Sequence, residues 1–231
     1  MNIVITGASK GIGKAIAEKF SIEGNRLFIC ARNKNNFSND LEEKTPETSI
    51  EYFAADLSKK EGVLEFGEWL LSQNIPIDIL VNNAGQFIPG SIYNEEEGTL
   101  EKMIAVNLYS AYHLTRMLLP AMMGKKTGHV FNMCSIASLQ AYRNGGSYSI
   151  SKYALMGFSK NLREEMKPYN IKVTTVYPGA VYTSSWEGAD VDPKRILEVN
   201  DIADMIFAAS HLSPQACVED IIIRPQAGDM P

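Results

Sequence analysis

Residues 2–13, NIVITGASKGIG, decide the fold that this sequence predicts. The run from Asn2 to Thr6 is typical of a buried strand, and a helix reaching about Glu23 is expected to follow the last glycine directly. Three glycines at such a turn let the backbone approach a phosphate, which free N–H groups and the helix dipole attract. The segment therefore predicts a nucleotide-binding loop. Its G-x-x-x-G-x-G spacing lacks the Gly-Lys-Ser/Thr ending of a P-loop, which argues against a kinase or an ATPase.

Outward from this loop, hydrophobic runs alternate with helical patterns along the whole chain, without internal repeats or linkers. This alternation predicts a single α/β domain over residues 1–231, with a doubly wound parallel sheet flanked by helices. Strands are expected at residues 2–6, 26–31, 50–54, 77–81, 128–134, 171–177 and 218–224. Helices are expected at 58–73 (beginning with a Ser58–Glu61 capping box), 98–123, 147–167 and 200–212 (capped by Asn200). The polar stretch 33–49 is expected to be a surface connection or a frayed helix.

Composition and charge argue against several classes of protein. The net charge of −5 and the isoelectric point near 5.3 disfavour binding to nucleic acid or to an anionic membrane. No apolar stretch is long enough to cross a bilayer, and the first residues lack the features of a secretory signal. The cysteines, Cys30, Cys134 and Cys217, and the histidines, His113, His129 and His211, show no metal-ligand spacing. The sequence therefore predicts a cytoplasmic protein with reduced thiols and no metal site.

The end of the second expected strand lies where the adenosine ribose of a dinucleotide would bind. An acidic residue there usually meets a free 2′-hydroxyl, but this chain has Ala31 followed by Arg32. Arg32, together with Lys10 from the glycine loop, could pair with a 2′-phosphate, so the sequence favours NADP(H) over NAD(H). The alternative is that both are solvated surface charges. Asp56, after the third expected strand, is either a turn residue or a cofactor contact.

Polar residues also follow the fourth and fifth expected strands. Asn82-Asn83-Ala84-Gly85 suits the close approach of a flat ligand, although a plain loop explains these residues equally well. Ser135 is either a turn residue or a ligand contact, because ligands bind at this edge of open α/β sheets. Asn107 lies inside the expected helix 98–123, where asparagine is unfavourable, which predicts a specific hydrogen-bonding role.

Tyr148 and Lys152 lie four residues apart in the expected helix 147–167, so they share one face. A neighbouring ammonium group favours the phenolate, and we expect Lys152 to lower the pKa of Tyr148 below its usual value of about 10. Such a phenol could exchange protons near neutral pH. The alternative is a core tyrosine beside a solvated lysine, which this spacing alone does not exclude.

Taken together, these residues resemble the short-chain dehydrogenase/reductase family over essentially the whole chain. The motifs that match are Thr6-Gly7-x-x-x-Gly11-x-Gly13, Asp56, Asn82-Asn83-Ala84-Gly85, Asn107, Ser135, Tyr148-x-x-x-Lys152, and Pro178-Gly179 with Thr183. They occur in the family's order, and Ser135 precedes Tyr148 by the usual thirteen residues. The resemblance implies a Rossmann-type sheet of about seven strands.

The resemblance also implies roles for individual residues. Tyr148 is expected to donate a proton, Ser135 to orient the substrate carbonyl, and Lys152 to bind the nicotinamide ribose while lowering the tyrosine pKa. Asn107 is expected to hold a water in a proton relay. The residues implied for cofactor binding are Gly7, Ser9, Lys10, Gly11, Ile12, Gly13, Arg32, Asp56, Leu57, Asn83, Ala84, Gly85, Tyr148, Lys152, Pro178, Gly179, Val181 and Thr183. Arg32 and Lys10 match the pattern of NADP(H)-preferring members.

The implied function is that of an NADPH-dependent ketone or aldehyde reductase, which transfers a hydride between nicotinamide and a carbonyl or secondary alcohol. The alternatives are an NAD-dependent alcohol or 3-hydroxy-acid dehydrogenase, and a catalytically silent NADP(H)-binding sensor or scaffold. No histidine and no G-x-S-x-G elbow accompany Ser135, which argues against a hydrolase. The resemblance further implies a homo-oligomer, either a dimer or a tetramer, that pairs through the two long helices.

Residues 180–199, which include Trp186 and show little periodicity, are expected to form a mobile substrate flap. The chain is shorter here than in many family members, and residues 221–226 lack the double glycine common in the family's ketoacyl-carrier-protein reductases. Both departures argue against fatty-acid synthesis and favour the subgroup of sepiapterin-reductase-like and 3-hydroxy-acid dehydrogenase enzymes. The candidates for lining the substrate pocket are Phe87, Tyr142, Tyr182 and Trp186.

Overall fold

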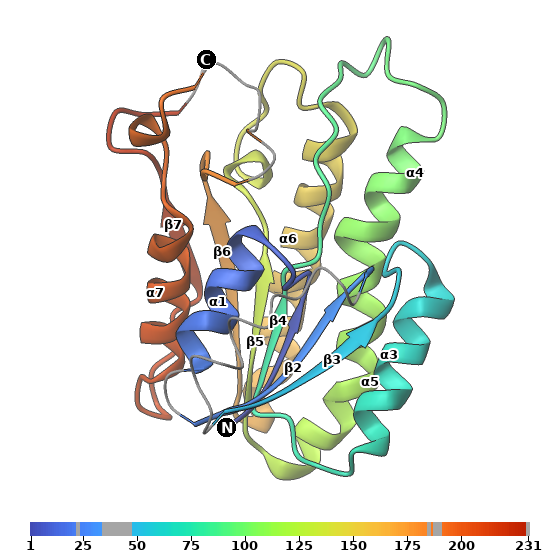
Figure 1. Cartoon of the computed structure of the whole chain (residues 1–231), viewed down its shortest axis with the longest axis vertical. Coiled ribbons are helices and arrows are strands. Elements are labelled where there is room, and N and C mark those ends of the chain that lie inside the picture. Colours follow the sequence, from blue (N-terminus) through green and yellow to red (C-terminus); the bar gives the residue numbers. More distant parts are fainter. Residues whose placement is uncertain (22–23, 34–47, 184–185, 187–190, 230–231) are drawn as a thin grey trace.

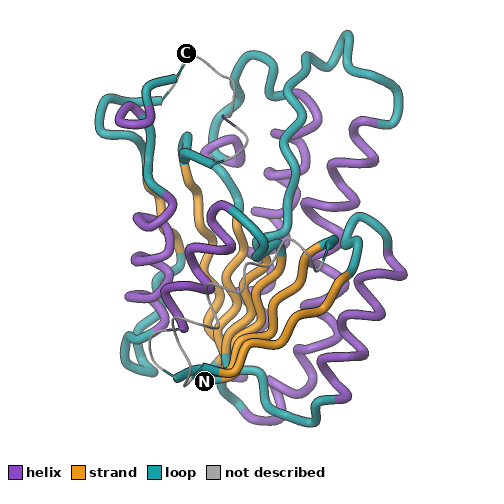
Figure 2. The backbone as a smooth tube through the Cα atoms, viewed as in Figure 1, coloured by secondary structure: helices purple, strands orange, loops and turns teal. Residues whose placement is uncertain are grey.

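A single parallel sheet of seven strands forms the centre of the molecule (Figures 1 and 2). The computed structural model describes residues 1–21, 24–33, 48–183, 186 and 191–229. The strands are β1 Asn2–Thr6, β2 Arg26–Ala31, β3 Ser49–Ala54, β4 Ile79–Asn82, β5 Gly128–Met133, β6 Ile171–Pro178 and β7 Asp220–Ile223. Their order is β3-β2-β1-β4-β5-β6-β7, and every neighbouring pair is parallel. The predicted Rossmann-type fold is confirmed.

The strand order reverses between β1 and β4, which are neighbours in the sheet. The chain winds outward from β1 through β2 to β3, crosses back to β4, and then winds outward in the other direction to β7. In an open parallel sheet the loops that leave the two strands at such a point diverge to opposite faces and leave a crevice between them. The loops after Thr6 and Asn82 therefore lie where a ligand would bind.

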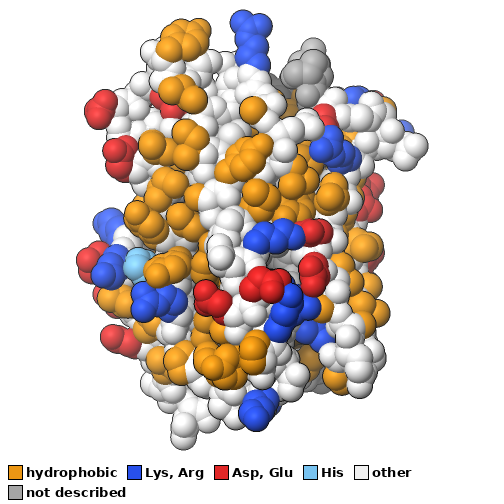
Figure 3. Space-filling view, turned by 180° about the vertical axis from the view of Figure 1, so that it is seen from behind, with side chains coloured by type: hydrophobic (Ala, Val, Ile, Leu, Met, Phe, Trp, Pro, Cys, Tyr) orange, Lys and Arg blue, Asp and Glu red, His pale blue; other side chains and the backbone are white. Residues whose placement is uncertain are grey.

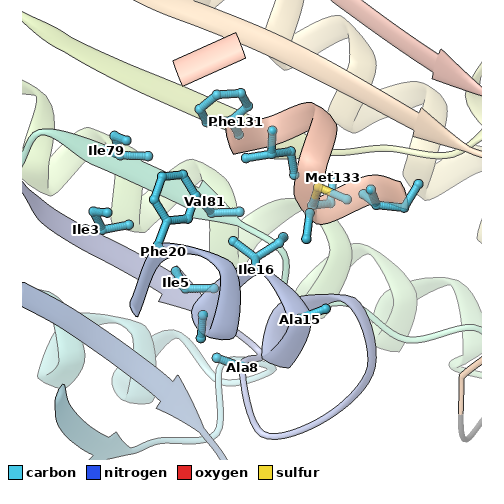
Figure 4. Packing of buried hydrophobic residues seen from close by; sticks show 14 of the residues in the cluster. Ile3, Ile5, Ala8, Ala15, Ile16, Phe20, Ile79, Val81, Phe131 and Met133 are labelled. Carbon is cyan, nitrogen blue, oxygen red and sulfur yellow. The ribbon is translucent and has the colours of Figure 1, made fainter. Parts of the chain in front are cut away.

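The sheet is buried on both faces because its central strands carry apolar side chains on both sides. On β1, Ile3 and Ile5 pack in one hydrophobic cluster, whereas Val4 packs in the other. This alternation follows from the two-residue period of a strand. Figure 4 shows the first cluster, in which Phe20 and Ile16 of the first helix pack against β1 residues.

Helices cover both faces of the sheet (Figure 1). Helices α1 Gly11–Ser21 and α7 Val199–Ser210 cover one face, and α3 Lys60–Ser72, α5 Ser110–Lys125 and α6 Gly146–Met166 cover the other. Helix α4 Thr99–Ile104 packs on α6. The described short elements are a π-helix, η2 Ala105–Tyr109, and three 3₁₀ turns, η3 Ile136–Ser138, η4 Lys167–Tyr169 and η6 Pro193–Arg195.

Two predicted helix caps are wrong. Ser58 does not cap α3, because both its N–H and its hydroxyl donate to Asp56 Oδ1, and the helix begins at Lys60 instead. Asn200 lies inside α7, which is capped by Glu198 in a reciprocal pair of hydrogen bonds with Asp201. In α7 the Glu198 carboxylate thus forms the bond that the predicted Asn200 cap would have formed, whereas α3 has no side-chain cap.

The predicted helix 98–123 is three elements instead of one. Helix α4 leads into the π-helix η2, which leads into α5. A π-helix widens the turn by one residue and rotates the side chains that follow. Asn107 lies at the centre of this widened turn and is almost fully buried.

The two ends of the 180–199 segment are hydrogen-bonded to each other, and the segment also contacts the C-terminal residues of the chain. Val181 and Leu197 form an isolated bridge, in which Tyr182 N–H donates to Leu197 O at 2.8 Å and Leu197 N–H donates to Ala180 O at 2.9 Å. Arg195 donates to backbone carbonyls of the final residues, Ala227 to Asp229. Residues 184–185 and 187–190 of the expected flap, and residues 34–47 of the expected polar connection, lie outside the described residues.

Candidate active site

The glycine loop has the backbone geometry that a phosphate-binding turn requires. Gly7 and Gly11 adopt φ angles of +67° and +56°, in the left-handed region that side chains disfavour. A Cβ on Gly13 would overlap the Gly7 carbonyl oxygen and would lie 2.5 Å from Asn83 Nδ2. The loop thus presents bare backbone ahead of α1, which is the kind of cradle that a pyrophosphate occupies.

Thr6 and Asn83 hold the two loops of the β1–β4 crevice together. The Thr6 hydroxyl oxygen accepts from Asn83 N–H at 3.0 Å and from Ala84 N–H at 2.9 Å. Asn83 Nδ2 in turn donates to Thr6 O at 2.9 Å and to Gly7 O at 3.1 Å. Thr6 belongs to the predicted glycine motif, but no role was predicted for its side chain. Its position at the end of β1, beside a polar loop, is the feature that indicates a hydrogen-bonding role.

Asn82, the first residue of the Asn82–Gly85 motif, has a structural role. Its Nδ2 donates to Thr115 Oγ1 on α5 at 2.9 Å and to Asn132 Oδ1 on β5 at 2.8 Å. Both partners are fully buried, so these bonds join the sheet to α5 beneath the crevice.

Two cations lie at the carboxyl ends of β1 and β2. Lys10 and Arg32 are both exposed, with Lys10 in the glycine loop and Arg32 directly after β2. The pKa of Asp56 is lowered, mainly by the hydrogen bond from the Ser58 hydroxyl and to a lesser degree by charges that include Arg32. Arg32 therefore lies close enough to the end of β3 to act on a carboxylate there. The bonds from Ser58 place Asp56 in a turn, and the predicted cofactor contact stays a prediction.

Other residues predicted for cofactor binding occupy several settings around the crevice. Thr183 contacts the position that a Gly11 Cβ would take, at 3.3 Å, so the start of the 180–199 segment adjoins the glycine loop. Gly179 N–H donates to Ile223 O at 2.7 Å, after β6 ends at Pro178. Leu57 and Val181 are buried in the hydrophobic clusters, and their predicted cofactor contacts stay predictions.

Ser135 is held rigidly just past β5. It is the N-cap of the 3₁₀ turn η3, where its hydroxyl oxygen accepts from Ala137 N–H at 3.2 Å while its own N–H donates to Ser138 Oγ at 3.3 Å. Its hydroxyl lies near enough to the Tyr148 phenol to lower the pKa of that group. Ser138, which is fully buried, positions Ser135 and was not predicted, although its S-x-x-S spacing is a cap signal.

Tyr148 and Lys152 lie together on α6, as the spacing predicts. The Lys152 side chain is buried, its Nζ donates to Met133 O at 2.7 Å, and Nζ lies 5.8 Å from the centroid of the Tyr148 ring. The predicted fall in the pKa of Tyr148 is wrong. Burial raises the pKa of Tyr148 to about 12, against a smaller lowering by the Ser135 hydroxyl. Burial also lowers the pKa of Lys152 to about 8, because desolvation disfavours each charged form.

Asn107 is hydrogen-bonded both to the loop after β4 and to helix α6, which carries Tyr148 and Lys152. Its Oδ1 accepts from Gln86 N–H at 2.7 Å, and its Nδ2 donates to Gln86 O at 3.0 Å and to Ser151 Oγ at 2.8 Å. Ser151 lies between Tyr148 and Lys152 in sequence, and its hydroxyl donates to Tyr148 O at 2.7 Å. The predicted hydrogen-bonding role is therefore confirmed. The further role of holding a water in a proton relay stays a prediction.

The predicted aromatic residues differ in their relation to the site. The Phe87 ring packs edge-on against the Tyr148 ring, with centroids 4.8 Å apart, and about half of Phe87 is exposed. Tyr142 and Tyr182 are also exposed, and Trp186 N–H donates to Thr183 O at 3.0 Å. Phe87 is therefore the described aromatic residue in direct contact with the candidate proton donor.

The fold and the site define the class of protein. A sheet that reverses at β1–β4, a glycine loop at the reversal, and a serine, a tyrosine and a lysine gathered beside it are the parts of a dinucleotide-dependent oxidoreductase. Within the described part of the chain, no three or more His, Cys, Asp or Glu side chains are grouped to hold a metal ion. In the same part of the chain, no helix has the length and apolarity to span a membrane.

Comparison with known proteins identifies the family. The model of the short chain dehydrogenase family matches residues 1–193, and the chain belongs to this family of oxidoreductases. An uncharacterized oxidoreductase from Staphylococcus epidermidis is 31% identical over 224 residues, which cover 96% of each chain. A similar uncharacterized oxidoreductase from Staphylococcus aureus is 29% identical over 222 residues, again 96% of each chain.

Solved structures of similar proteins share the fold over nearly their whole length. A metagenomic short-chain oxidoreductase in complex with NADP has a TM-score of 0.84 at 30% identity, covering 98% of this chain and 97% of that one. An alcohol dehydrogenase from Thermococcus sibiricus complexed with 5-hydroxy-NADP has a TM-score of 0.90 at 26% identity, covering 100% and 98%. The L-sorbose reductase of Gluconobacter frateurii, complexed with NADPH and L-sorbose, has a TM-score of 0.87 at 28% identity, covering 96% and 94%.

Proposed function

We propose that this protein is an NADPH-dependent reductase of ketones or aldehydes, which also oxidises the corresponding alcohols. One observation carries the proposal: the Ser135 hydroxyl lies near enough to the Tyr148 phenol to lower its pKa, and the buried Lys152 amine lies on the same helix as Tyr148. This group lies at the sheet edge that also carries the glycine loop. We further propose that residues 1–231 act as one catalytic domain, that residues 180–199 form its substrate flap, and that the protein is a homo-oligomer.

The residues suit carbonyl reduction. Bound NADPH supplies the hydride that the carbonyl carbon receives. In this proposal the Ser135 and Tyr148 hydroxyls both donate to the carbonyl oxygen, where negative charge develops. Tyr148 then gives its proton to that oxygen, and the nearby Lys152 ammonium stabilises the phenolate that is left. Asn107 and Ser151 hold the start of this helix against the crevice.

The choice of NADP(H) rests on charge at the outer end of the crevice. Lys10 and Arg32 are exposed there and can meet a 2′-phosphate, which a carboxylate in the same place would repel. The similar proteins solved with NADP or NADPH support the same choice. Gly7, Gly11 and Gly13 leave the bare backbone that the pyrophosphate needs.

A substrate screen tests this function. Wild-type protein is incubated with NADPH and a panel of aldehydes, simple ketones, keto acids and keto sugars, and the oxidation of NADPH is followed optically. We expect turnover of at least one carbonyl class, and slower turnover with NADH. Tight NADPH binding without oxidation by any carbonyl in the panel would favour the catalytically silent sensor instead.

A further inference from the structure

Glu95 binds the first turn of the helix that carries Tyr148 and Lys152. Its Oε1 accepts from Ser147 N–H at 2.8 Å, and its Oε2 accepts from the Ser147 hydroxyl. Ser147 directly precedes Tyr148 and is almost fully buried. Both oxygens of one carboxylate therefore hold the residue next to the candidate proton donor.

The contact between Glu95 and Ser147 replaces a local helix cap on α6. The N-cap of α6 is Gly145, which has no side chain to bond the free N–H groups of the first turn. Glu95, 52 positions before Ser147 in the sequence, supplies an acceptor in place of the usual local side chain. A carboxylate at this end of a helix is also favoured by the helix dipole.

Two glycines make room for the carboxylate. A Cβ on Gly146, whose φ angle is +29°, would overlap Glu95 Oε1 and would lie 2.5 Å from Gly90 O. A Cβ on Gly90 would lie 2.7 Å from Glu95 Cγ. A side chain at either position would displace Glu95, so this position of the carboxylate requires glycine at both places.

The segment from Gln86 to Glu95 is bound to the catalytic elements at both ends. At its start, Gln86 exchanges two backbone hydrogen bonds with the Asn107 side chain, and Phe87 packs on the Tyr148 ring. Further along, Gly90 N–H donates to Asn144 O at 3.1 Å, and Ser91 Oγ donates to Asn144 Oδ1 at 2.6 Å. Glu95 then closes the segment onto Ser147.

We propose that Glu95 is a positioning residue for the reaction. It acts through Ser147, by holding the first turn of α6, and through the 86–95 segment, by holding Phe87 against Tyr148. The direction of the Tyr148 hydroxyl toward the substrate carbonyl depends on both contacts. The inference rests on the proposed reductase activity, because Glu95 itself touches neither Ser135 nor the glycine loop in any described contact.

The test compares three variants with the wild type. Glu95→Ala removes both contacts, Glu95→Gln keeps an acceptor for Ser147 N–H and a polar group for its hydroxyl, and Glu97→Ala removes an equal charge from an exposed neighbour. We expect Glu95→Ala to lower kcat about 10- to 100-fold while the Kd for NADPH changes little, because a displacement of about 1 Å near the reacting groups is enough for such a loss. Glu95→Gln should restore most of kcat, and Glu97→Ala should match the wild type.

Equal kcat in Glu95→Ala and Glu97→Ala would overturn the proposal, as would a Glu95→Gln variant as slow as Glu95→Ala. If Glu95→Ala does not fold, the Ser147→Ala variant replaces it, and a kcat equal to that of the wild type would then overturn the proposal. Hydrogen exchange separates this result from a failure of the reductase function. Should the wild type reduce no carbonyl, the amides of Ser147 to Ser149 must still exchange faster in Glu95→Ala, and unchanged exchange would refute the role of Glu95.

Discussion

The Tyr148 phenol is the group on which the proposed chemistry depends. With its pKa raised to about 12, it is protonated at neutral pH, which is the form that a proton donor needs. Lys152, with a pKa of about 8, is mostly cationic at the same pH. Burial acts on both groups more strongly than their mutual proximity does. The spacing of the pair predicted which residues meet, but not how far from water they lie.

Arg32 carries the prediction on cofactor preference. Its guanidinium is exposed at the end of β2, where it can pair with a 2′-phosphate but has no such partner on NADH. We expect Arg32→Ala to raise the Kd for NADPH about tenfold or more, while the Kd for NADH changes little. Fluorescence titration with both cofactors measures this. An equal loss of affinity for the two cofactors would contradict the assignment.

Because His129 is buried, we expect the folded protein to lose stability in acid. It is buried on β5, where burial lowers its pKa to about 3. Thr174 Oγ1 donates to Val218 O, so His129 Nε2 must donate to Thr174, and Nδ1, which is without a hydrogen-bond partner among the described residues, would take the added proton. The folded ring thus stays neutral while an unfolded histidine binds a proton below about pH 6.5, so stability is full above that pH and falls as the pH drops toward 3.

The effect is measured by urea unfolding at pH 7 and pH 5. The wild type should lose about 2 kcal/mol more than His129→Gln between these values, since one proton taken up on unfolding is worth about 1.4 kcal/mol per pH unit. His113→Gln is the matched control, because the His113 ring is only half-buried and its pKa is lowered less by burial. Identical pH slopes for the wild type and His129→Gln would rule out this explanation.

At the scale of elements, the backbone of the glycine loop can approach a bound cofactor closely because its glycines carry no side chains. We expect Gly13→Ala to raise the Kd for NADPH at least about tenfold, because a Cβ there meets the Gly7 carbonyl and Asn83 Nδ2. Gly124→Ala on α5 is the control, since a Cβ at Gly124 meets no described atom within 4 Å. Cofactor titration of both variants decides the matter, with melting temperatures to confirm folding. An unchanged Kd in Gly13→Ala would show that the loop does not need this close approach.

The strands were predictable from the sequence because each is a run of apolar residues bounded by turn residues. The carboxyl ends of these runs then predicted where Ser135, Asn83 and the glycine loop gather. The π-helix at Ala105–Tyr109 was not predictable, because one inserted residue in a helix leaves the apolar pattern on both sides nearly unchanged. It is the element that turns Asn107 inward.

Contacts between distant segments were also beyond the sequence. Glu95 and Ser147 are 52 positions apart, and no local pattern pairs them. Ser58 and Asn200 are good cap residues, but Ser58 is hydrogen-bonded to Asp56 and α3 begins after it, while Glu198 caps α7 in place of Asn200. Local rules identify which residues can form a cap, whereas the packed structure decides which one does.

At the scale of the molecule, we expect the face formed by α5 and α6 to be the interface between subunits of the proposed homo-oligomer. The rear view in Figure 3 shows hydrophobic side chains spread over this side of the molecule. Tyr109 and Tyr112 on the η2–α5 side, and Ile150 and Tyr153 on α6, are large and exposed, and the Tyr112 ring packs on Phe158 of α6. Apolar surface of this kind is typical of a subunit interface.

We expect light scattering to give a mass that is two or four times 25.6 kDa. The double variant Tyr112→Glu/Tyr153→Glu should dissociate the assembly, because charge buried in an apolar interface is unfavourable. Met205→Glu, which places the same charge on the exposed side of α7, is the control. A wild-type mass of one chain at micromolar concentration would refute the proposed homo-oligomer.

The most direct test of the whole account is turnover by Tyr148→Phe, a change that removes one hydroxyl and keeps the ring. On the best carbonyl substrate of the wild type, the account predicts that kcat falls at least about 100-fold, because the general acid is lost, while the Kd for NADPH is nearly unchanged. Turnover by Tyr148→Phe equal to that of the wild type would contradict the assignment of Tyr148 as the proton donor.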